Sequence, residues 1–265
     1  MKKWPGLIRA FAMIAAVASF ATAARANRDV IVHSSDPANW AVQSGDYSGR
    51  RYSTLDQINK DNVRDLKVAW TFSTGVLRGH EGGPLVIGDT MYLVTPFPNV
   101  VMALDLAQDQ KILWKYQPKQ ASSVIGVMCC DSVNRGVQYA EGKILVHTAD
   151  TSLIALDAKT GMELWKVADD DPKNGATGTG APLIVKDKVI VGVSGGEFGV
   201  RCYITAYDLN SGHKIWRAYS MGPDEDILVD PEKTLVLGKP VGKDSSLSTW
   251  NGDQWKIGGG PTWGY

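Results

Sequence analysis

The sequence predicts an all-β fold, and within that class a β-propeller. Three observations support this: a tryptophan that recurs at a fixed interval, short apolar runs of strand length between its copies, and a high content of glycine (28 residues). Stretches with helical periodicity are few. Short apolar runs separated by glycine-containing turns are typical of antiparallel sheets.

The repeat has three well-matched copies, in which Trp114, Trp165 and Trp216 follow one another at intervals of 51 residues. In each copy we expect one strand to end at an aspartate and a second strand to end at the tryptophan. Trp70, 44 residues before Trp114, is a candidate for an earlier copy. A period near fifty residues with four strands in each unit is typical of propeller blades. A β-sandwich with coincidental tryptophans is the weaker interpretation.

The apolar runs between these tryptophans are expected to supply the other strands, at residues 84–87, 91–94, 143–146 and 188–193. Each tryptophan is interpreted as a core residue that stacks on the turn of the next blade, because a large flat side chain buries much apolar surface there. About four blades fit into residues 27–265, and four-bladed propellers exist.

The first 26 residues are typical of a secretory signal peptide. A basic start, an apolar stretch at residues 7–20 and small residues at 21–26 predict cleavage near Ala26. Arg9 interrupts the apolar stretch, which is short for a membrane span, so a retained anchor is the weaker interpretation. No later segment offers a span. The mature chain is therefore expected in an exported, oxidising compartment, where disulfides persist.

The charge balance argues against a nucleic-acid partner. The chain has 28 basic and 28 acidic residues and a pI near 6.9. A protein that binds a polyanion normally carries a basic excess. His80-Glu81 lacks the second histidine of a zinc helix, and no Cys-x-x-Cys-His motif for covalent haem occurs.

Cys129 and Cys130 are adjacent in the sequence. Neighbouring Cα atoms lie about 3.8 Å apart, whereas disulfides prefer roughly 4.4–6.8 Å. A bridge between them would be strained and would close almost no loop, so a structural staple explains the pair poorly. Two reduced thiols, or a bond from one of them to Cys202, remain the alternatives. Cys202 is otherwise interpreted as buried in a strand.

Four segments together resemble the quinoprotein methanol dehydrogenases, a family of pyrroloquinoline-quinone-dependent alcohol dehydrogenases: residues 74–82, 127–136, 194–201 and 255–260. The resemblance runs from about Trp40 to Trp263. It implies an eight-bladed propeller with the cofactor near its central axis, of which residues 27–265 would form the N-terminal half. It also implies that Gly258, Gly259 and Gly260 let the backbone pass close to the cofactor.

The resemblance implies a role for each matching residue. Cys129 and Cys130 would form a disulfide over one face of the quinone, and Trp263 would stack on the other face. The partners of the quinone carboxylates would be Arg135, Thr179 and Ser194, with Arg135 the strongest. Glu81 would orient Arg135.

The resemblance also places Gly195 and Gly196 at the cofactor and Glu197 on a catalytic metal ion. A hard cation prefers oxygen ligands, and as a Lewis acid it would polarise the quinone carbonyl. The ion would be a lanthanide or calcium. Gly196 is similar to the lanthanide-dependent branch, because the calcium enzymes tend to carry alanine there.

The chain departs from the family near its C-terminus. Pro261 stands where relatives usually have a polar or small residue, and Gly264-Tyr265 differs from their aromatic continuation. The second metal ligand, the catalytic base and the aspartate typical of lanthanide enzymes are expected beyond Tyr265, so no catalytic residue is assigned within this chain. Half a ring would expose blade faces. We therefore expect the isolated chain to be unstable or to associate, and to lack dehydrogenase activity.

The resemblance implies periplasmic oxidation of methanol or another primary alcohol. The base would remove the hydroxyl proton, hydride would pass to the quinone, and electrons would leave to a c-type cytochrome. Full-length relatives are expected to be homodimers. The alternative is a non-enzymatic propeller that serves as a periplasmic scaffold, or a fragment without function.

Overall fold

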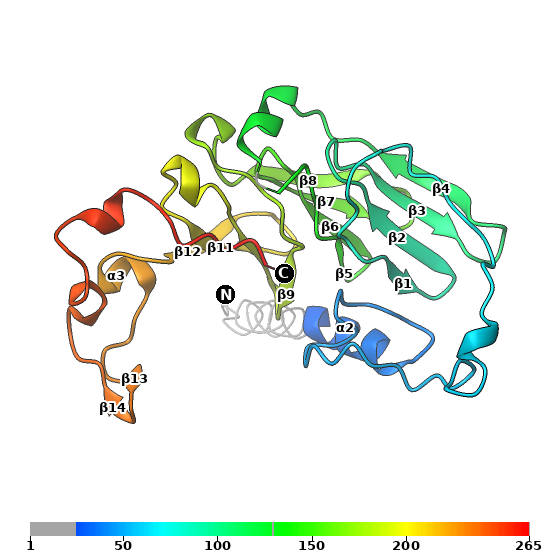
Figure 1. The fold of residues 1–265 in the computed structure, drawn as a ribbon, viewed down its shortest axis with the longest axis horizontal. Coiled ribbons are helices and arrows are strands. Elements are labelled where there is room, and N and C mark those ends of the chain that lie inside the picture. The colour runs from blue at the N-terminus through cyan, green and yellow to red at the C-terminus, as the bar shows by residue number, and fades with distance from the viewer. Residues whose placement is uncertain (1–24, 129, 265) are drawn as a thin grey trace, which may run out of the picture.

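The computed structural model describes residues 25–128 and 130–264 (Figure 1). The predicted signal peptide lies outside this part of the chain except for Arg25 and Ala26, and it stays a prediction. The first described element is helix α2 (Arg25–Ser35). Among the described residues, no helix has both the length and the apolar character needed to cross a membrane.

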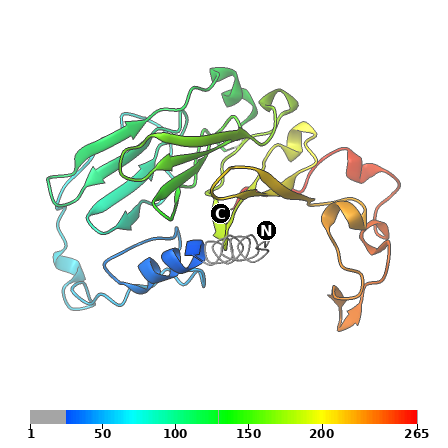
Figure 2. The same ribbon diagram turned by 180° about the vertical axis from the view of Figure 1, so that it is seen from behind.

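Three four-stranded antiparallel sheets form the body of the structure, and in each sheet the strands lie in sequence order. The first contains β1 (Leu85–Ile87), β2 (Thr90–Val94), β3 (Val101–Asp105) and β4 (Lys111–Tyr116). The second contains β5 (Gln138–Ala140), β6 (Lys143–His147), β7 (Ser152–Asp157) and β8 (Glu163–Ala168). The third contains β9 (Leu183–Val185), β10 (Lys188–Gly192), β11 (Tyr203–Asp208) and β12 (Lys214–Tyr219). Figures 1 and 2 show the sheets following one another along an arc, as in part of a propeller.

The remaining elements are short and connect or flank these sheets. After β12 the chain leaves the arc through α3 (Asp224–Ile227) and a hairpin of β13 (Leu235–Val236) and β14 (Lys239–Pro240). Single 3₁₀ turns lie at Val63–Asp65, Ser122–Val127, Pro172–Asn174, Gly196–Phe198, Ser245–Leu247 and Gln254–Lys256. The excursion is visible at one end of the arc in both ribbon views.

The all-β prediction is confirmed, and the predicted strand ends are confirmed at Asp105, Asp157 and Asp208. The prediction that the following strand ends at the tryptophan is wrong by two or three residues. Each of these strands continues past its tryptophan, because its partner strand offers further residues to pair with. Val101, for example, pairs with Tyr116.

The repeat extends to a detail that the sequence pattern did not predict. Each tryptophan lies opposite an alanine, in the pairs Ala103–Trp114, Ala155–Trp165 and Ala206–Trp216. Directly after each of these alanines the register shifts by one residue, which is a β-bulge. A bulge bends and twists its strand. It therefore changes the direction of the tryptophan side chain at the equivalent position of each sheet.

The tryptophans contact the neighbouring sheet. The indole N–H donates to a backbone carbonyl of the next sheet, in the pairs Trp114–Ala158 (2.9 Å) and Trp165–Leu209 (3.2 Å). The ring lies on a glycine of the same turn: a Cβ at Gly161 would come within 2.6 Å of Trp114, and one at Gly212 within 2.7 Å of Trp165. Both glycines have positive φ. Each turn therefore needs glycine for its backbone and for the space above it.

The core lies between consecutive sheets. One cluster joins the first and second sheets, with Leu85 and Trp114 on one side and Ile144 and Leu156 on the other. A second cluster joins the second and third sheets and includes Val30 of α2, which is completely buried. The helix therefore contributes to the same junction as the sheets.

Three units of the predicted repeat are four-stranded sheets, and the prediction of about four blades stays a prediction. The described residues form three four-stranded sheets, and the segment around Trp70 contains no strand. Trp70 is 41% exposed, and other large apolar side chains near it, such as Val68 and Leu77, are more exposed still. A strand requires a partner that accepts its backbone hydrogen bonds, and no neighbouring strand among the described residues offers one to this segment.

Candidate functional site

Arg135 connects several of the predicted site residues. Its backbone N–H donates to the carbonyl of Thr179 at 2.9 Å. Its Nη2 lies 3.1 Å from Oε2 of Glu81. Its guanidinium also lies over the indole of Trp263, with 4.9 Å from Cζ to the ring centroid. The structure thus brings together four of the residues singled out in the sequence.

Two donors in this cluster are buried without a hydrogen-bond partner among the described residues: Nη1 of Arg135 and Oγ1 of Thr179. A buried polar group left unpaired costs roughly 1–3 kcal/mol, and such groups in proteins normally have a function or a missing partner. A guanidinium N–H and a hydroxyl are both donors that suit the oxygen atoms of an anion. The donor set therefore fits a ligand carboxylate.

Ser194 is held by a threonine that the sequence reasoning missed. Its hydroxyl lies 2.7 Å from that of Thr177, and the backbones of the two residues form a β-bridge. Thr177 and Thr179 are two positions apart in an extended segment, so their side chains share one face. That spacing is the signal in the sequence that could have identified Thr177.

Several glycines allow backbone segments to touch behind this cluster. A Cβ at Gly195 would overlap the carbonyl oxygen of Gly175, and one at Gly196 would lie 2.9 Å from the Cα of Gly259. The run at 258–260 also meets protein atoms: a Cβ at Gly258 would lie 2.5 Å from the carbonyl carbon of Gly199. The structure therefore explains these glycines by packing within the chain, whereas the prediction assigned the run at 258–260 to the approach of a cofactor.

His147 is a second residue that the sequence reasoning missed. Its side chain is fully buried, and neither ring nitrogen has a partner among the described residues. A Cβ at Gly178 would lie 2.7 Å from the imidazole, so the ring packs directly behind the segment that carries Thr177 and Thr179. Burial lowers the pKa of His147 below its usual value, because the charged imidazolium loses its hydration.

The described residues do not assemble a metal site around Glu197. This side chain is exposed and lies in the 3₁₀ turn Gly196–Phe198. Within residues 25–128 and 130–264, no three histidine, cysteine, aspartate or glutamate side chains lie close enough together to hold an ion. A single carboxylate does not provide the six or more ligands that such a cation takes.

The predicted Cys129–Cys130 disulfide stays a prediction, because Cys129 lies outside the described residues. Cys130 is exposed and, like Asp131, has a positive φ. Cys202 is a buried free thiol immediately before β11, and its S–H donates to the carbonyl of Val200 at 3.4 Å. Burial raises the pKa of Cys202 to about 11.

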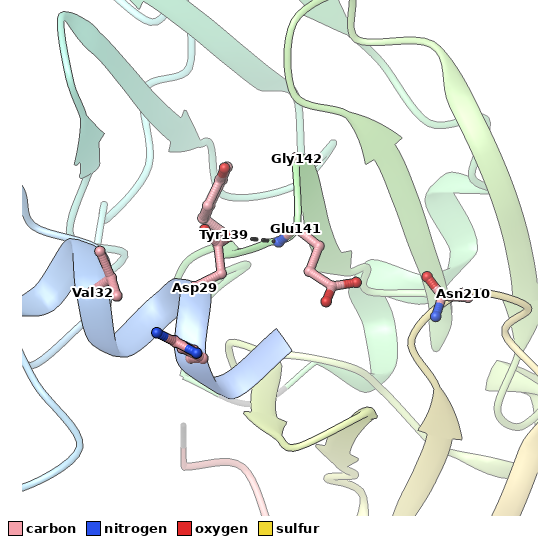
Figure 3. A pocket seen from close by; sticks show the side chains of 7 residues that line it. Asp29, Val32, Tyr139, Glu141, Gly142 and Asn210 are labelled. Atoms are coloured by element: carbon pink, nitrogen blue, oxygen red, sulfur yellow. Dashed lines mark hydrogen bonds between the residues drawn. The ribbon is translucent and has the colours of Figure 1, made fainter. Parts of the chain in front are cut away.

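One pocket of the structure lies beside the Arg135 cluster, and another lies away from it. A pocket of about 380 Å³ is lined by Trp40, Gln43, Arg51, Glu81, Gly83 and Arg135, and so includes two of the predicted site residues. Another of about 750 Å³ lies between α2 and two turns, lined by Arg28, Asp29, Val32, Tyr139, Glu141, Gly142 and Asn210 (Figure 3). Asp29 accepts a hydrogen bond there from the backbone of Glu141 at 2.9 Å. This second pocket contains none of the predicted site residues.

The chain is similar to several methanol dehydrogenases. The lanthanide-dependent methanol dehydrogenase of Methylorubrum extorquens is 62% identical over 260 residues, which are 97% of this chain and 43% of that protein. Subunit 1 of the cytochrome c methanol dehydrogenase of Paracoccus denitrificans is 47% identical over 98% of this chain and 42% of its own length. A solved europium-containing methanol dehydrogenase superposes with a TM-score of 0.83 at 52% identity, covering 90% of this chain and 42% of its own.

The chain thus spans less than half the length of these relatives. Residues 40–250 match the family model described as the β-propeller domain of glucose/ethanol/alcohol dehydrogenases. That match covers the three sheets and most of the residues that surround Arg135. The chain therefore belongs to the glucose/ethanol/alcohol dehydrogenase β-propeller family.

Proposed function

We propose that this chain forms part of an eight-bladed propeller that binds pyrroloquinoline quinone and oxidises a primary alcohol. The observation that carries the proposal is the pair of unpartnered buried donors, Nη1 of Arg135 and Oγ1 of Thr179, beside the indole of Trp263. A flat ligand that bears carboxylates satisfies both the donors and the aromatic face. The names of the relatives, which are methanol dehydrogenases, support the same assignment.

In this proposal, the residues of the chain bind and orient the ligand. Arg135 and Thr179 donate to its carboxylates, and Ser194, whose hydroxyl donates to the carbonyl of Thr177 in the ligand-free chain, is proposed as a further partner. Glu81 holds the guanidinium from the other side. Trp263 stacks on one face of the quinone ring and restricts it to one plane. The Cys129–Cys130 disulfide is proposed to cover the other face of the quinone. When bound, the quinone supplies the acceptor for the hydride of the alcohol.

Glu197 is proposed as one ligand of a lanthanide or calcium ion. Its carboxylate has the hard oxygen atoms that such cations prefer, and two of the relatives are named for a lanthanide. Gly195 and Gly196 are proposed to lie against the cofactor beside it. The other metal ligands and the base that takes the hydroxyl proton are proposed to lie beyond Tyr265.

We propose methanol or another primary alcohol as substrate, a c-type cytochrome as electron acceptor and the periplasm as location. One relative carries cytochrome c in its name, and the N-terminal residues have the pattern of an export signal. A homodimer is proposed for the full-length protein. The alternative proposal is a non-enzymatic periplasmic propeller scaffold or a fragment without function, and the lack of further metal-binding side chains near Glu197 among the described residues favours it.

Quinone retention tests the proposal. The chain is mixed with pyrroloquinoline quinone in the presence of lanthanum or calcium and passed through a desalting column, and the quinone absorbance that stays with the protein is measured. Arg135→Lys is expected to weaken retention at least tenfold, because lysine lacks the planar fork that binds a carboxylate through two bonds. The matched control is Arg64→Lys, at a side chain that is 83% exposed. Absence of retention by the unmodified chain, or equal retention by Arg135→Lys, contradicts the proposal.

A further inference from the structure

The segment at residues 257–264 returns to the third sheet and attaches to it through Thr262. The backbone N–H of Thr262 donates to the carbonyl of Val193 at 2.9 Å. Its hydroxyl accepts the N–H of Val193 at 2.9 Å and donates to the carbonyl of Tyr203 at 2.5 Å. Thr262 therefore holds the part of the segment next to Trp263 to the end of β10 and to the start of β11, while Gly259 attaches the earlier part through backbone bonds to Val200 and Cys202.

Two glycines make this close attachment possible. A Cβ at Gly192 would overlap the carbonyl oxygen of Thr262, and a Cβ at Gly180 would overlap that of Gly264. Any side chain at either position would displace the segment. The backbone on both sides of Trp263 therefore packs directly on Gly192 and Gly180. The position of the indole depends on these contacts.

The same attachment sets the distance between Trp263 and the proposed ligand-binding groups. Val193, the partner of Thr262, directly precedes Ser194 in the chain. On the other side, the indole lies over Arg135, whose backbone is bonded to Thr179. A shift of the segment along the end of β10 would move the indole relative to all three groups.

We propose that Thr262 is a positioning residue for the quinone site, and that its hydroxyl sets the plane of Trp263 against Arg135, Thr179 and Ser194. This inference rests on the proposed function in naming the quinone as the ligand. The geometry that it assigns to Trp263 exists without the ligand, so it is tested separately. Thr262 itself needs no contact with the bound molecule.

The first measurement uses the ligand-free chain labelled with 5-fluorotryptophan, and follows the fluorine resonance of Trp263 by NMR. The resonance is identified by its loss in Trp263→Phe. Thr262→Val keeps the shape of the side chain but removes the hydroxyl, and is expected to shift this resonance. Thr262→Ser keeps the hydroxyl and is expected to retain the original shift.

The matched control is Thr160→Val, which removes a hydroxyl that bonds to Asp157 on an exposed turn of the second sheet. It is expected to leave the Trp263 resonance unchanged. An unchanged resonance in Thr262→Val overturns the proposal. If Thr262→Val loses its circular dichroism signal, the folded variant Thr262→Ser provides the test. A shifted Trp263 resonance in Thr262→Ser then overturns the proposal.

The second measurement is quinone affinity, by the retention assay above. Thr262→Val is expected to bind the quinone about tenfold more weakly, because it loses both hydrogen bonds of the hydroxyl and with them the position of Trp263. Thr262→Ser is expected to restore the affinity. Absence of quinone binding by the unmodified chain contradicts the proposed function, and the fluorine shift still tests the role of Thr262.

Discussion

The guanidinium of Arg135 lies against the indole face of Trp263, 4.9 Å from Cζ to the ring centroid. A cation over an aromatic face is stabilised by the ring quadrupole. The contact joins the start of the second sheet to the segment that follows the long excursion after β12. The proposed quinone site is thus built at a point where distant parts of the chain meet.

Replacing Glu81 tests how much the ion pair contributes to this site. Glu81 is 45% exposed and lies 3.1 Å from Arg135, which is 19% exposed. Because solvent reaches the carboxylate and screens the pair, its contribution is about 1 kcal/mol at most. Glu81→Gln is therefore expected to lower the free energy of unfolding by less than about 1 kcal/mol. The urea midpoint of unfolding, at low and at high salt, measures this loss of stability. Asp131→Asn is the control, because it removes a carboxylate of similar exposure (41%) from a pair with the exposed Arg78. A much larger loss with Glu81→Gln would contradict the view that solvent screens this pair.

The tryptophan contacts between sheets predict a strong asymmetry between two glycines. Gly161 (φ +71°) and Gly142 (φ +72°) have the same backbone conformation. Alanine at either costs about 1–2 kcal/mol of backbone strain. At Gly161 the new Cβ also meets Trp114 at 2.6 Å, whereas at Gly142 it meets open space.

We therefore expect Gly161→Ala to be less stable than Gly142→Ala by a further 1–3 kcal/mol, roughly the cost of overpacking. Urea unfolding monitored by tryptophan fluorescence measures both variants. Equal losses of stability would show that Trp114 does not depend on the glycine beneath it.

A buried ion pair joins the second and third sheets. Nη2 of Arg217 lies 2.6 Å from Oδ1 of Asp169, whose side chain is completely buried, and the guanidinium stacks on Tyr203 at 3.6 Å. Arg217→Met removes the partner of a buried carboxylate, so a loss of about 3–5 kcal/mol is expected.

Arg50→Met is the control for this variant, because Arg50 is 69% exposed in its pair with Asp46. The control is expected to lose at most about 1 kcal/mol in the same urea titration. Similar losses in the two variants would refute the structural role given to the Asp169–Arg217 pair.

The sequence predicted the repeating part of the fold, because that part depends on local patterns. An aspartate at the end of an apolar run and a tryptophan at a constant interval predicted two strands of each sheet, and the apolar runs between them predicted β1, β2, β6 and β10. The short strands β5 and β9 were not predicted. The bulge before each tryptophan was not predictable, since it depends on pairing with a neighbouring strand. The same reason explains Trp70, whose sequence suits a strand but which has no strand beside it among the described residues.

The site was predictable only in part. The resemblance singled out Arg135 and Thr179, but only the structure shows that one backbone bonds to the other. Thr177, His147 and Thr262 act through contacts between segments far apart in the sequence, and no local motif marks such contacts. The hydroxyl of Thr262 bonds to Tyr203, for instance, across 59 positions of the chain.

The buried imidazole of His147 predicts a loss of stability in acid. Its pKa is lowered from 6.5 in the folded chain, first because burial disfavours the charged form. The unfolded chain therefore binds a proton more readily than the folded chain does. This contribution to stability is fully present above about pH 6.5 and is lost as the pH falls through the lower folded pKa. His147→Leu, which cannot be protonated, is expected to show a smaller difference in urea midpoint between pH 7.5 and pH 5. His213→Leu, at an exposed histidine, should keep the difference of the unmodified chain. If His147→Leu loses as much stability in acid as the unmodified chain, other groups cause the acid sensitivity.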